Sequence, residues 1–255
     1  PQVKNIVGVA SGKGGVGKST TAVNLALALA AEGASVGLLD ADIYGPSQPM
    51  MMGIEGRPES ADGKTMEPME NHGVQVMSIG FLVNQDEAMI WRGPMATQAL
   101  EQLLRQTNWK DLDYLIIDLP PGTGDVQLSL VQNVPLTGVV IVTTPQEMAL
   151  TDARRAMGMF SMEAVNKKIL GVVENMSYFT PDDAPDKKYR LFGEGGGKAL
   201  SEEYNVPFLG ELPLNPALMK LIDEGNLTSD AIELKPYDQV AGALAQQVSM
   251  LQITK

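Results

Sequence analysis

The 255-residue sequence contains no cysteine and only one histidine. Without cysteine, the chain cannot form a disulfide, bind a metal through thiolates or use a thiol as a nucleophile. The lack of disulfides fits the reducing cytoplasm, where we expect the protein to be located. The single histidine, His72, has no partner for a metal site, and its place beside Gly73 indicates a surface turn.

Basic residues are also scarce. Lysine and arginine number 19 against 31 aspartates and glutamates, which gives a formal net charge of −12. This charge repels phosphate backbones and anionic lipids, so we expect neither nucleic acid nor membrane as a partner. No apolar run approaches the ~20 residues of a membrane span, and no signal peptide opens the sequence. Because the sequence begins with Pro1 rather than methionine, we expect an upstream segment to be missing.

Short apolar runs alternate along the chain with segments of helical periodicity, which is typical of βα units around a parallel sheet. Several runs are apolar without alternation, as expected for strands covered on both faces. We predict strands at residues 5–10, 35–40, 74–79, 114–119, 138–143, 169–174 and 207–212. Helices are predicted at residues 18–32, 94–107, 126–132, 148–165, 196–204, 216–224 and 237–251.

Two stretches interrupt this alternation. Residues 53–73 are rich in glycine, proline and methionine and predict a surface excursion, with a hairpin as one option. Residues 178–197 form a polar insertion after the sixth predicted strand. Since there is no internal repeat and no long linker, we predict that residues 1–255 form one domain.

A glycine-rich loop joins the first predicted strand to the first predicted helix. Residues 12–19 read GKGGVGKS, and this strand–loop–helix context is the one that a P-loop requires. Glycines let backbone N–H groups turn toward phosphates, and the helix N-terminus adds partial positive charge. The fold class is therefore predicted to be α/β, a single-domain P-loop NTPase with a mostly parallel central sheet covered by helices.

Each residue type in this loop has an expected task. Lys18 is expected to contact the β and γ phosphates, and the Ser19 hydroxyl to bind Mg²⁺. Thr20 and Thr21 are candidates for the α phosphate. The predicted cofactors are thus ATP and Mg²⁺, and the expected nucleotide contacts come from Gly12, Gly14, Gly15, Val16, Gly17, Lys18, Ser19 and Thr20.

Acidic residues end two of the predicted strands. Asp40 and Asp42 share one face of an extended backbone, so one can hold the Mg²⁺ shell while the other orients or deprotonates water. Capping of a following helix is the alternative. Asp118 ends an apolar strand in the Walker B arrangement and is expected to bind Mg²⁺ directly or through water. In the loop that follows, Gly122 is a candidate N–H donor to the γ phosphate, and Asp125 is expected to cap the next helix.

The second lysine of the glycine loop gives the first resemblance to a known group. The spacing Lys-Gly-Gly-x-Gly-Lys-Ser resembles the deviant Walker A loop of the MinD, ParA and nitrogenase iron protein group. The resemblance implies that Lys13 reaches the partner's nucleotide in a homodimer bridged by ATP. It also implies that Asp42 positions the attacking water and that Asp40 lies nearer the metal. Catalytic roles are thereby expected for Lys13, Lys18 and Asp42.

Longer blocks narrow the resemblance to the Mrp/ApbC family. The blocks begin at Asp40 (DADIYGPS), Trp91 (WRGPM), Asp118 (DLPPGTGD), Glu174 (ENMS) and Phe192 (FGEGG). The family consists of dimeric ATPases regarded as iron–sulfur cluster carriers or scaffolds. The resemblance implies this function, with iron–sulfur client or scaffold proteins as partners.

The resemblance also implies which residues read the base. Asn175 would recognise adenine, with Pro213 among the residues lining the base. A carboxamide can both donate and accept at an adenine edge, although capping of the sixth predicted strand is the alternative for Asn175. The sequence contains no Asn/Thr-Lys-x-Asp motif for guanine, so ATP is expected over GTP.

One feature of the family is missing. Many members carry Cys-x-x-Cys shortly after the Met-Ser-Tyr-Phe block, whereas residues 180–186 here read TPDDAPD. An iron–sulfur cluster ordinarily needs thiolate ligands, and aspartates are hard oxygen ligands suited to Ca²⁺ or Mg²⁺. The resemblance therefore implies ATPase activity for this protein, but the sequence supplies no thiolate ligands for a cluster.

The leading functional hypothesis is a dimeric carrier or assembly factor for iron–sulfur proteins that binds and hydrolyses ATP. One alternative is a MinD/ParA-like ATPase for spatial regulation, and the other is an ATP-driven interaction switch with no bound cluster. A spatial regulator needs a basic DNA surface or a basic amphipathic tail, but Lys255 is the only cation in residues 241–255. The carrier and the switch are both consistent with the sequence.

Overall fold

The computed structural model describes residues 3–82 and 93–253. In this part of the chain, one eight-stranded sheet has the order β3-β4-β2-β5-β1-β6-β7-β8, and only the β3–β4 pair is antiparallel. The strands are β1 (Val3–Ala10), β2 (Val36–Asp40), β3 (Met69–Asn71), β4 (Val74–Ser78), β5 (Leu112–Asp118), β6 (Gly138–Thr143), β7 (Ile169–Tyr178) and β8 (Phe208–Pro213).

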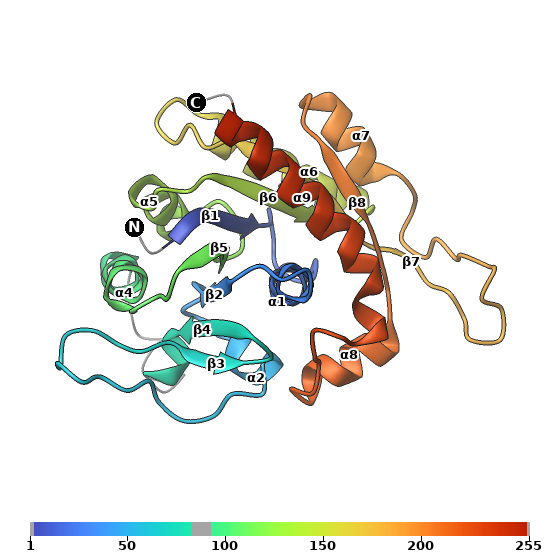
Figure 1. The fold of residues 1–255 in the computed structure, drawn as a ribbon. Helices are drawn as coiled ribbons and strands as arrows, with labels where there is room; N and C mark the ends of the chain where they lie inside the picture. Colours follow the sequence, from blue (N-terminus) through green and yellow to red (C-terminus); the bar gives the residue numbers. More distant parts are fainter. Residues whose placement is uncertain (1–2, 83–92, 254–255) are drawn as a thin grey trace.

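Helices cover both faces of this sheet (Figure 1). On one face, α1 (Lys18–Ala31) packs against α9 (Lys235–Ile253), with α2 (Gln48–Met51) and α8 (Pro216–Asp223) nearby. The other face carries α4 (Gly93–Gln106), α5 (Asp125–Asn133), α6 (Glu147–Ser161) and α7 (Gly196–Glu203). Two 3₁₀ turns, η1 (Ile79–Phe81) and η2 (Ile232–Leu234), complete the described elements.

Burial explains why the predicted elements form. All residues of β2 and β6 are buried, as expected for central parallel strands that are apolar throughout. In α1, residues 21–29 are all buried because the helix lies between the sheet and α9. The helix stops where Gly33 takes a left-handed φ of 88°, which confirms the predicted stop. The mostly parallel, helix-covered sheet is thereby confirmed.

Several local features differ from the prediction. The four-residue helix α2 was not predicted, since it is too short to show periodicity. Strand β7 runs four residues beyond the predicted end at Glu174, past a register shift against β8. Asp125 is the first residue of α5 rather than its cap, because Gly124 takes the cap position.

The two interrupting stretches lie at opposite sides of the molecule in Figure 1. The first ends in β3, which pairs with β4, so its last residues do form a hairpin. The second is the long loop between β7 and α7, where Phe179 and Tyr189 form an isolated antiparallel bridge. Trp91 and Arg92 of the WRGPM block lie outside the described residues.

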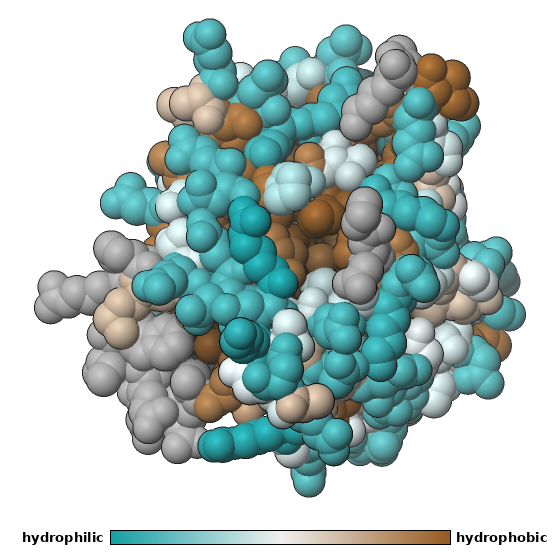
Figure 2. Space-filling model, turned by 60° about the vertical axis from the view of Figure 1, so that its left-hand side comes forward, coloured by the Kyte–Doolittle hydropathy of each residue, from teal (hydrophilic) through white to brown (hydrophobic). Residues whose placement is uncertain are grey.

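Hydrophilic residues cover most of the molecular face in Figure 2, and apolar residues gather in a hollow near its middle. This surface agrees with a chain that carries 31 acidic and 19 basic side chains. Within residues 3–82 and 93–253, no helix is both long and apolar enough to cross a membrane.

Candidate nucleotide site

The candidate site lies at the carboxyl edge of the sheet, where β1, β2 and β5 end side by side. Asp40 and Asp118 are register partners in neighbouring parallel strands, and Val9 pairs with Asp118 on the other side. The loops that leave these strands therefore meet at one edge, the usual ligand-binding position in open parallel sheets. Asp40 and Asp118, both expected from the sequence to lie near Mg²⁺, are thus brought side by side.

The glycine loop follows β1 directly and takes backbone conformations that need glycine. Gly15 and Gly17 have φ values of 82° and 81°, in the left-handed region. At Gly12 a Cβ atom would overlap the backbone of Asp152 in α6, so this glycine permits the loop to pack closely on that helix. At Gly17 a Cβ atom would overlap the Asn175 amide.

Lys18 is the first residue of α1, and its ammonium group is buried in an ion pair with Asp118. The same Nζ atom lies 3.2 Å from the Ser19 hydroxyl oxygen. The lysine, the hydroxyl and the Walker B carboxylate therefore form one contiguous group. These are the residues expected to meet phosphate and metal.

Asp40 is fully buried, and its carboxylate holds the loop that follows β2. It accepts backbone N–H bonds from Asp42 at 3.1 Å, Ser47 at 2.9 Å and Gln48 at 3.1 Å. The Ser78 hydroxyl of β4 is a fourth donor, at 3.1 Å. Burial, followed by the charge of Asp118, raises the pKa of Asp40 to about 7. Asp40 thus anchors the loop that carries Asp42.

Asp42 is half-buried and lines the same cavity as Lys13 and Lys18. Burial raises the pKa of the Asp42 carboxyl above its usual value, and the nearby Lys18 ammonium opposes that change. The candidate N–H donor Gly122 instead donates to the Ser11 carbonyl at 3.0 Å. That contact ties the loop after β5 to the start of the glycine loop.

A cavity of about 290 Å³ opens above the glycine loop. It brings together Lys13, Ser19, Thr20 and Asp42, which the sequence predicted to share a site. The Lys13 side chain has no ion pair among the described residues, in contrast to Lys18. Two lysines and several hydroxyl groups thus line the cavity beside the single carboxylate of Asp42, and these cations and donors suit a polyphosphate.

A second cavity of about 250 Å³ adjoins the first and shares Gly15, Gly17 and Thr20 with it. Asn175 and Pro213, the predicted base-contacting residues, both line it. The Asn175 Nδ2 atom donates to the Val16 carbonyl at 2.9 Å, which leaves the amide oxygen for a ligand. The size and mixed lining suit a purine and its ribose.

The position of Asn175 follows from the end of β7. The next residue, Met176, has a φ of 54°, a left-handed value that is unusual for a residue other than glycine. It falls within the register shift between Glu174 and Tyr178. Bulges of this kind redirect side chains near functional sites.

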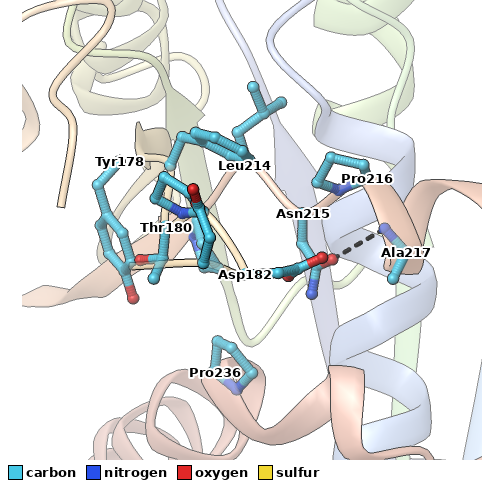
Figure 3. A pocket seen from close by; sticks show the side chains of 12 residues that line it. Tyr178, Thr180, Asp182, Leu214, Asn215, Pro216, Ala217 and Pro236 are labelled. Atoms are coloured by element: carbon cyan, nitrogen blue, oxygen red, sulfur yellow. Dashed lines mark hydrogen bonds between the residues drawn. The ribbon is translucent and has the colours of Figure 1, made fainter. Parts of the chain in front are cut away.

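A third cavity of about 610 Å³ continues from the second past Pro213, Leu214 and Asn215 (Figure 3). On its other side lies the chain from Tyr178 to Asp183. In Figure 3, Asp182 reaches toward Asn215, whose side chain accepts the Ala217 N–H at 3.0 Å and caps α8.

The side chains at the phosphate cavity fit Mg²⁺. A serine hydroxyl and carboxylates are oxygen ligands, which Mg²⁺ prefers, and it commonly completes its shell with water and phosphate. The charge of Asp118 disfavours ionisation of the neighbouring Asp40, so a cation beside the two carboxylates is favourable. Within residues 3–82 and 93–253, no three acidic or histidine side chains converge on a metal position, either here or at another place, so Mg²⁺ at this cavity would also need the serine hydroxyl, water and phosphate as ligands. The acidic loop at residues 182–186 therefore makes no such group.

Sequence reasoning missed two buried residues at the site. Gln48 contacts both Ser19 and Asp118, and its place after the DADIYGPS block was the available signal. Tyr237 of α9 lies at the base cavity with 2% of its surface exposed. Since α9 is the last helix, only the folded chain brings it next to Asn175.

The sequence matches known proteins over nearly its whole length. The model of a family described as "ParA: NUBPL iron-transfer P-loop NTPase" matches residues 2–249. An iron–sulfur cluster carrier protein of Synechocystis is 52% identical over 98% of this chain and 72% of its own length. A protein of the same name in Escherichia coli is 53% identical over 97% of this chain. This chain spans only 66% of the E. coli protein.

Solved structures agree with the fold. A nucleotide-binding protein from Archaeoglobus fulgidus, solved in complex with ADP, superposes with a TM-score of 0.79 at 37% identity. The match covers 92% of this chain and 91% of that one. The cell division ATPase MinD of Pyrococcus furiosus has a TM-score of 0.68 over 95% of this chain and 98% of its own. At 22% identity, the second likeness concerns the fold alone.

Proposed function

The chain belongs to the ParA family of NUBPL-type iron-transfer P-loop NTPases, and we propose that it is an ATP-dependent assembly factor for iron–sulfur proteins. The proposal has two parts, a Mg²⁺-dependent ATPase and a role in cluster delivery. The observation that carries the first is the pair of adjoining cavities, one lined by Lys13, Lys18 and Ser19 and the other by Asn175. The relatives' names support the second.

In the proposed nucleotide complex, the triphosphate occupies the cavity above the glycine loop. Lys18 exchanges its contact with Asp118 for the β and γ phosphates, while backbone N–H groups of residues 12–20 surround them. Ser19 and Asp118 would hold Mg²⁺, directly or through water, and the neighbouring Asp40 carboxylate would add negative charge that favours the metal. Bound Mg²⁺ supplies positive charge against the phosphate oxygens.

The proposed chemistry is hydrolysis of ATP to ADP and inorganic phosphate. Asp42 lines the phosphate cavity and accepts a proton from, or orients, the attacking water. Its raised pKa makes it a better proton acceptor than an ordinary aspartate, because basicity follows pKa. Lys13 acts on the nucleotide of a second copy, so the active species is a homodimer bridged by ATP.

The cluster is the cargo in this proposal, and the chain does not hold it through its own side chains. The sequence has no cysteine, and the described residues contain no group of three histidine or acidic side chains that could hold a metal. Thiolates must therefore come from a scaffold or client protein. ATP-driven dimerisation would promote transfer between such partners.

The test is cluster delivery under anaerobic conditions. A cysteine-bearing scaffold loaded with iron and sulfide is mixed with an apo iron–sulfur enzyme, and recovery of enzyme activity is followed. We expect wild type with Mg²⁺ and ATP to accelerate recovery, and Lys18→Ala to give no acceleration because it loses nucleotide binding. Incubated alone with iron and sulfide, the chain should retain no stoichiometric iron after gel filtration.

Two outcomes contradict the proposal in different ways. If ATP hydrolysis occurs but recovery is unchanged, the cluster role is wrong and the ATPase stands as an interaction switch. If the chain alone retains iron and sulfide with the visible absorbance of a cluster, the assignment of thiolates to a partner is wrong.

A further inference from the structure

Gln48, the first residue of α2, contacts Ser19 and Asp118 of the proposed metal site, although it is neither acidic nor part of the glycine loop. Its side chain is fully buried. The amide nitrogen donates to Asp118 Oδ2 at 2.9 Å and to the Ser19 carbonyl at 3.1 Å. Both partner atoms are hydrogen-bond acceptors, so the amide nitrogen rather than the amide oxygen must face them.

The other end of this amide has no partner. Gln48 Oε1 is buried and receives no hydrogen bond from the described residues. A buried acceptor without a donor is costly, so such groups call for an explanation. By covalent geometry Oε1 is about 2.3 Å from Nε2, and it therefore lies close to Ser19 and Asp118.

We propose that Gln48 is a positioning residue of the Mg²⁺–ATP site, whose Oε1 accepts a hydrogen bond from a water molecule of the Mg²⁺ shell. This inference rests on the proposed ATPase. Mg²⁺ keeps several waters when it binds to proteins, and its charge makes them strong donors. The amide thus accepts from the metal's water while it donates to Asp118.

The backbone of Gln48 connects this contact to catalysis. Its N–H donates to Asp40 Oδ2, the oxygen that also accepts from Ser47 and Ser78. The same carboxylate holds the N–H of Asp42 through its other oxygen. One residue therefore joins the metal site to the loop that carries the water-positioning acid. Gln48 would thereby link occupancy of the metal site to the loop conformation that places Asp42.

The experiment measures metal binding rather than turnover. Mn²⁺, which takes the same oxygen ligands, is titrated into protein with a non-hydrolysable ATP analogue and followed by electron paramagnetic resonance. Gln48→Met keeps the bulk of the side chain and removes both polar ends. We expect it to weaken Mn²⁺ binding on the order of tenfold, with metal-free nucleotide affinity unchanged. Gln48→Glu keeps an acceptor and should hold Mn²⁺ at least as tightly as wild type.

Gln127→Met is the matched control, because Gln127 is also buried and both its amide atoms lack partners among the described residues. Gln127 lies in α5 and its amide has no hydrogen bond to Ser19, Asp40 or Asp118, so Mn²⁺ binding by Gln127→Met should equal that of wild type. Thermal unfolding establishes that each variant is folded. The role of Gln48 would be overturned if Gln48→Met bound Mn²⁺ as tightly as wild type. It would also be overturned if Gln127→Met or Gln48→Glu weakened Mn²⁺ binding as much as Gln48→Met does. Failure of wild type to bind Mn²⁺ with nucleotide would overturn the proposed ATPase as well.

Discussion

At the scale of single residues, the three acids at the sheet edge have different surroundings. Asp40 is surrounded by four donors and stabilises the loop after β2. Asp118 contacts the ammonium of Lys18 and the amide of Gln48. Asp42 projects from the loop into the phosphate cavity and is the acid most open to a water molecule there. Their different partners thus give the three acids different roles: Asp40 anchors the loop, Asp118 belongs to the metal site and Asp42 is the candidate base.

The first prediction concerns Asp42→Asn. The amide keeps the size of the side chain but is a poor proton acceptor, so the phosphate cradle should remain intact. We expect ATP affinity within a few-fold of wild type and turnover lower by about 10²-fold or more. Lys18→Ala should lose affinity and turnover together. Equilibrium binding of a fluorescent ATP analogue and phosphate release measure the two effects separately.

Asp182→Asn is the control for this substitution, since it removes the same charge from an exposed loop residue. Its phosphate release should match that of wild type. Turnover in Asp42→Asn equal to the control would remove Asp42 from the chemistry. Weak binding in Asp42→Asn would instead assign the residue to the nucleotide cradle.

Residues of the candidate site were predictable where a motif fixes their position. The glycine loop carries Lys18 and Ser19 wherever it lies between a strand and a helix, so sequence spacing sufficed. Gln48 and Tyr237 were not predictable, because neither belongs to a periodic pattern or a motif. Their contacts depend on how a loop and the last helix fold back onto α1.

At the scale of elements, hydrophobic runs predicted the central strands well. Strand β6 has the predicted bounds of 138–143, because a buried parallel strand is apolar at every position. The extension of β7 to Tyr178 was not predictable, since its polar residues follow a left-handed Met176. The short β3 and α2 depend on tertiary contacts with β4 and Asp40 rather than on local preference.

Helix α9 closes the base cavity and brings a buried phenol to it. Burial raises the pKa of Tyr237 to about 12, while the nearby Asn24 and Thr21 side chains partly oppose the shift. A tyrosine whose pKa is higher in the folded state retains its proton longer there than in the unfolded chain. The free energy of unfolding therefore decreases as pH rises from about 10 to about 12.

The second prediction follows from this difference. Tyr237→Phe removes the ionisable group at nearly constant volume, so its stability should fall less steeply over this pH window. Once the Tyr237 phenol is fully deprotonated, wild type should have lost about 3 kcal/mol of its free energy of unfolding. The figure follows from a difference of about two pKa units between the folded and unfolded states, at about 1.4 kcal/mol for each unit. Urea unfolding at successive pH values from 9 to 12 measures the difference.

The control for the phenylalanine series is Tyr189→Phe, at a residue that is 46% exposed. An exposed phenol carries no burial cost, so this variant should follow the wild-type curve. Parallel curves for Tyr237→Phe and wild type would show that the Tyr237 phenol has the same pKa in both states. Such curves would mean that the phenol is as well hydrated in the folded state as in the unfolded chain.

At the scale of the whole molecule, the order of the strands assembles the site from distant parts of the chain. The glycine loop follows β1, Asp118 ends β5 and Asn175 lies in β7, and these parallel strands all end at one edge of the sheet. The sequence predicted a parallel sheet but not this order. Strand order depends on which helices pack together, and no local pattern encodes that. The half-exposed Lys13 and the buried Lys18 both line the resulting phosphate cavity.

The last prediction tests that dimer. Lys18 already pairs with Asp118, whereas the half-exposed Lys13 has no ion pair among the described residues. Two ammonium groups on one triphosphate would repel each other, but a facing subunit's phosphates give Lys13 a separate partner. Each copy carries a net charge of −12, so long-range repulsion opposes association unless local contacts of this kind exceed it.

Lys13→Ala should therefore leave ATP affinity of the single chain within a few-fold and abolish dimerisation. Turnover should fall by about 10³-fold or more, as for other cations supplied in trans. Light scattering at tens of micromolar, with and without a non-hydrolysable ATP analogue, measures the association directly. Lys64→Ala removes one exposed charge outside the cavity and should dimerise like wild type. A wild type that stays monomeric with the analogue, or a Lys13→Ala variant that dimerises normally, would contradict the trans role, because the phosphate contact would then be made within one chain.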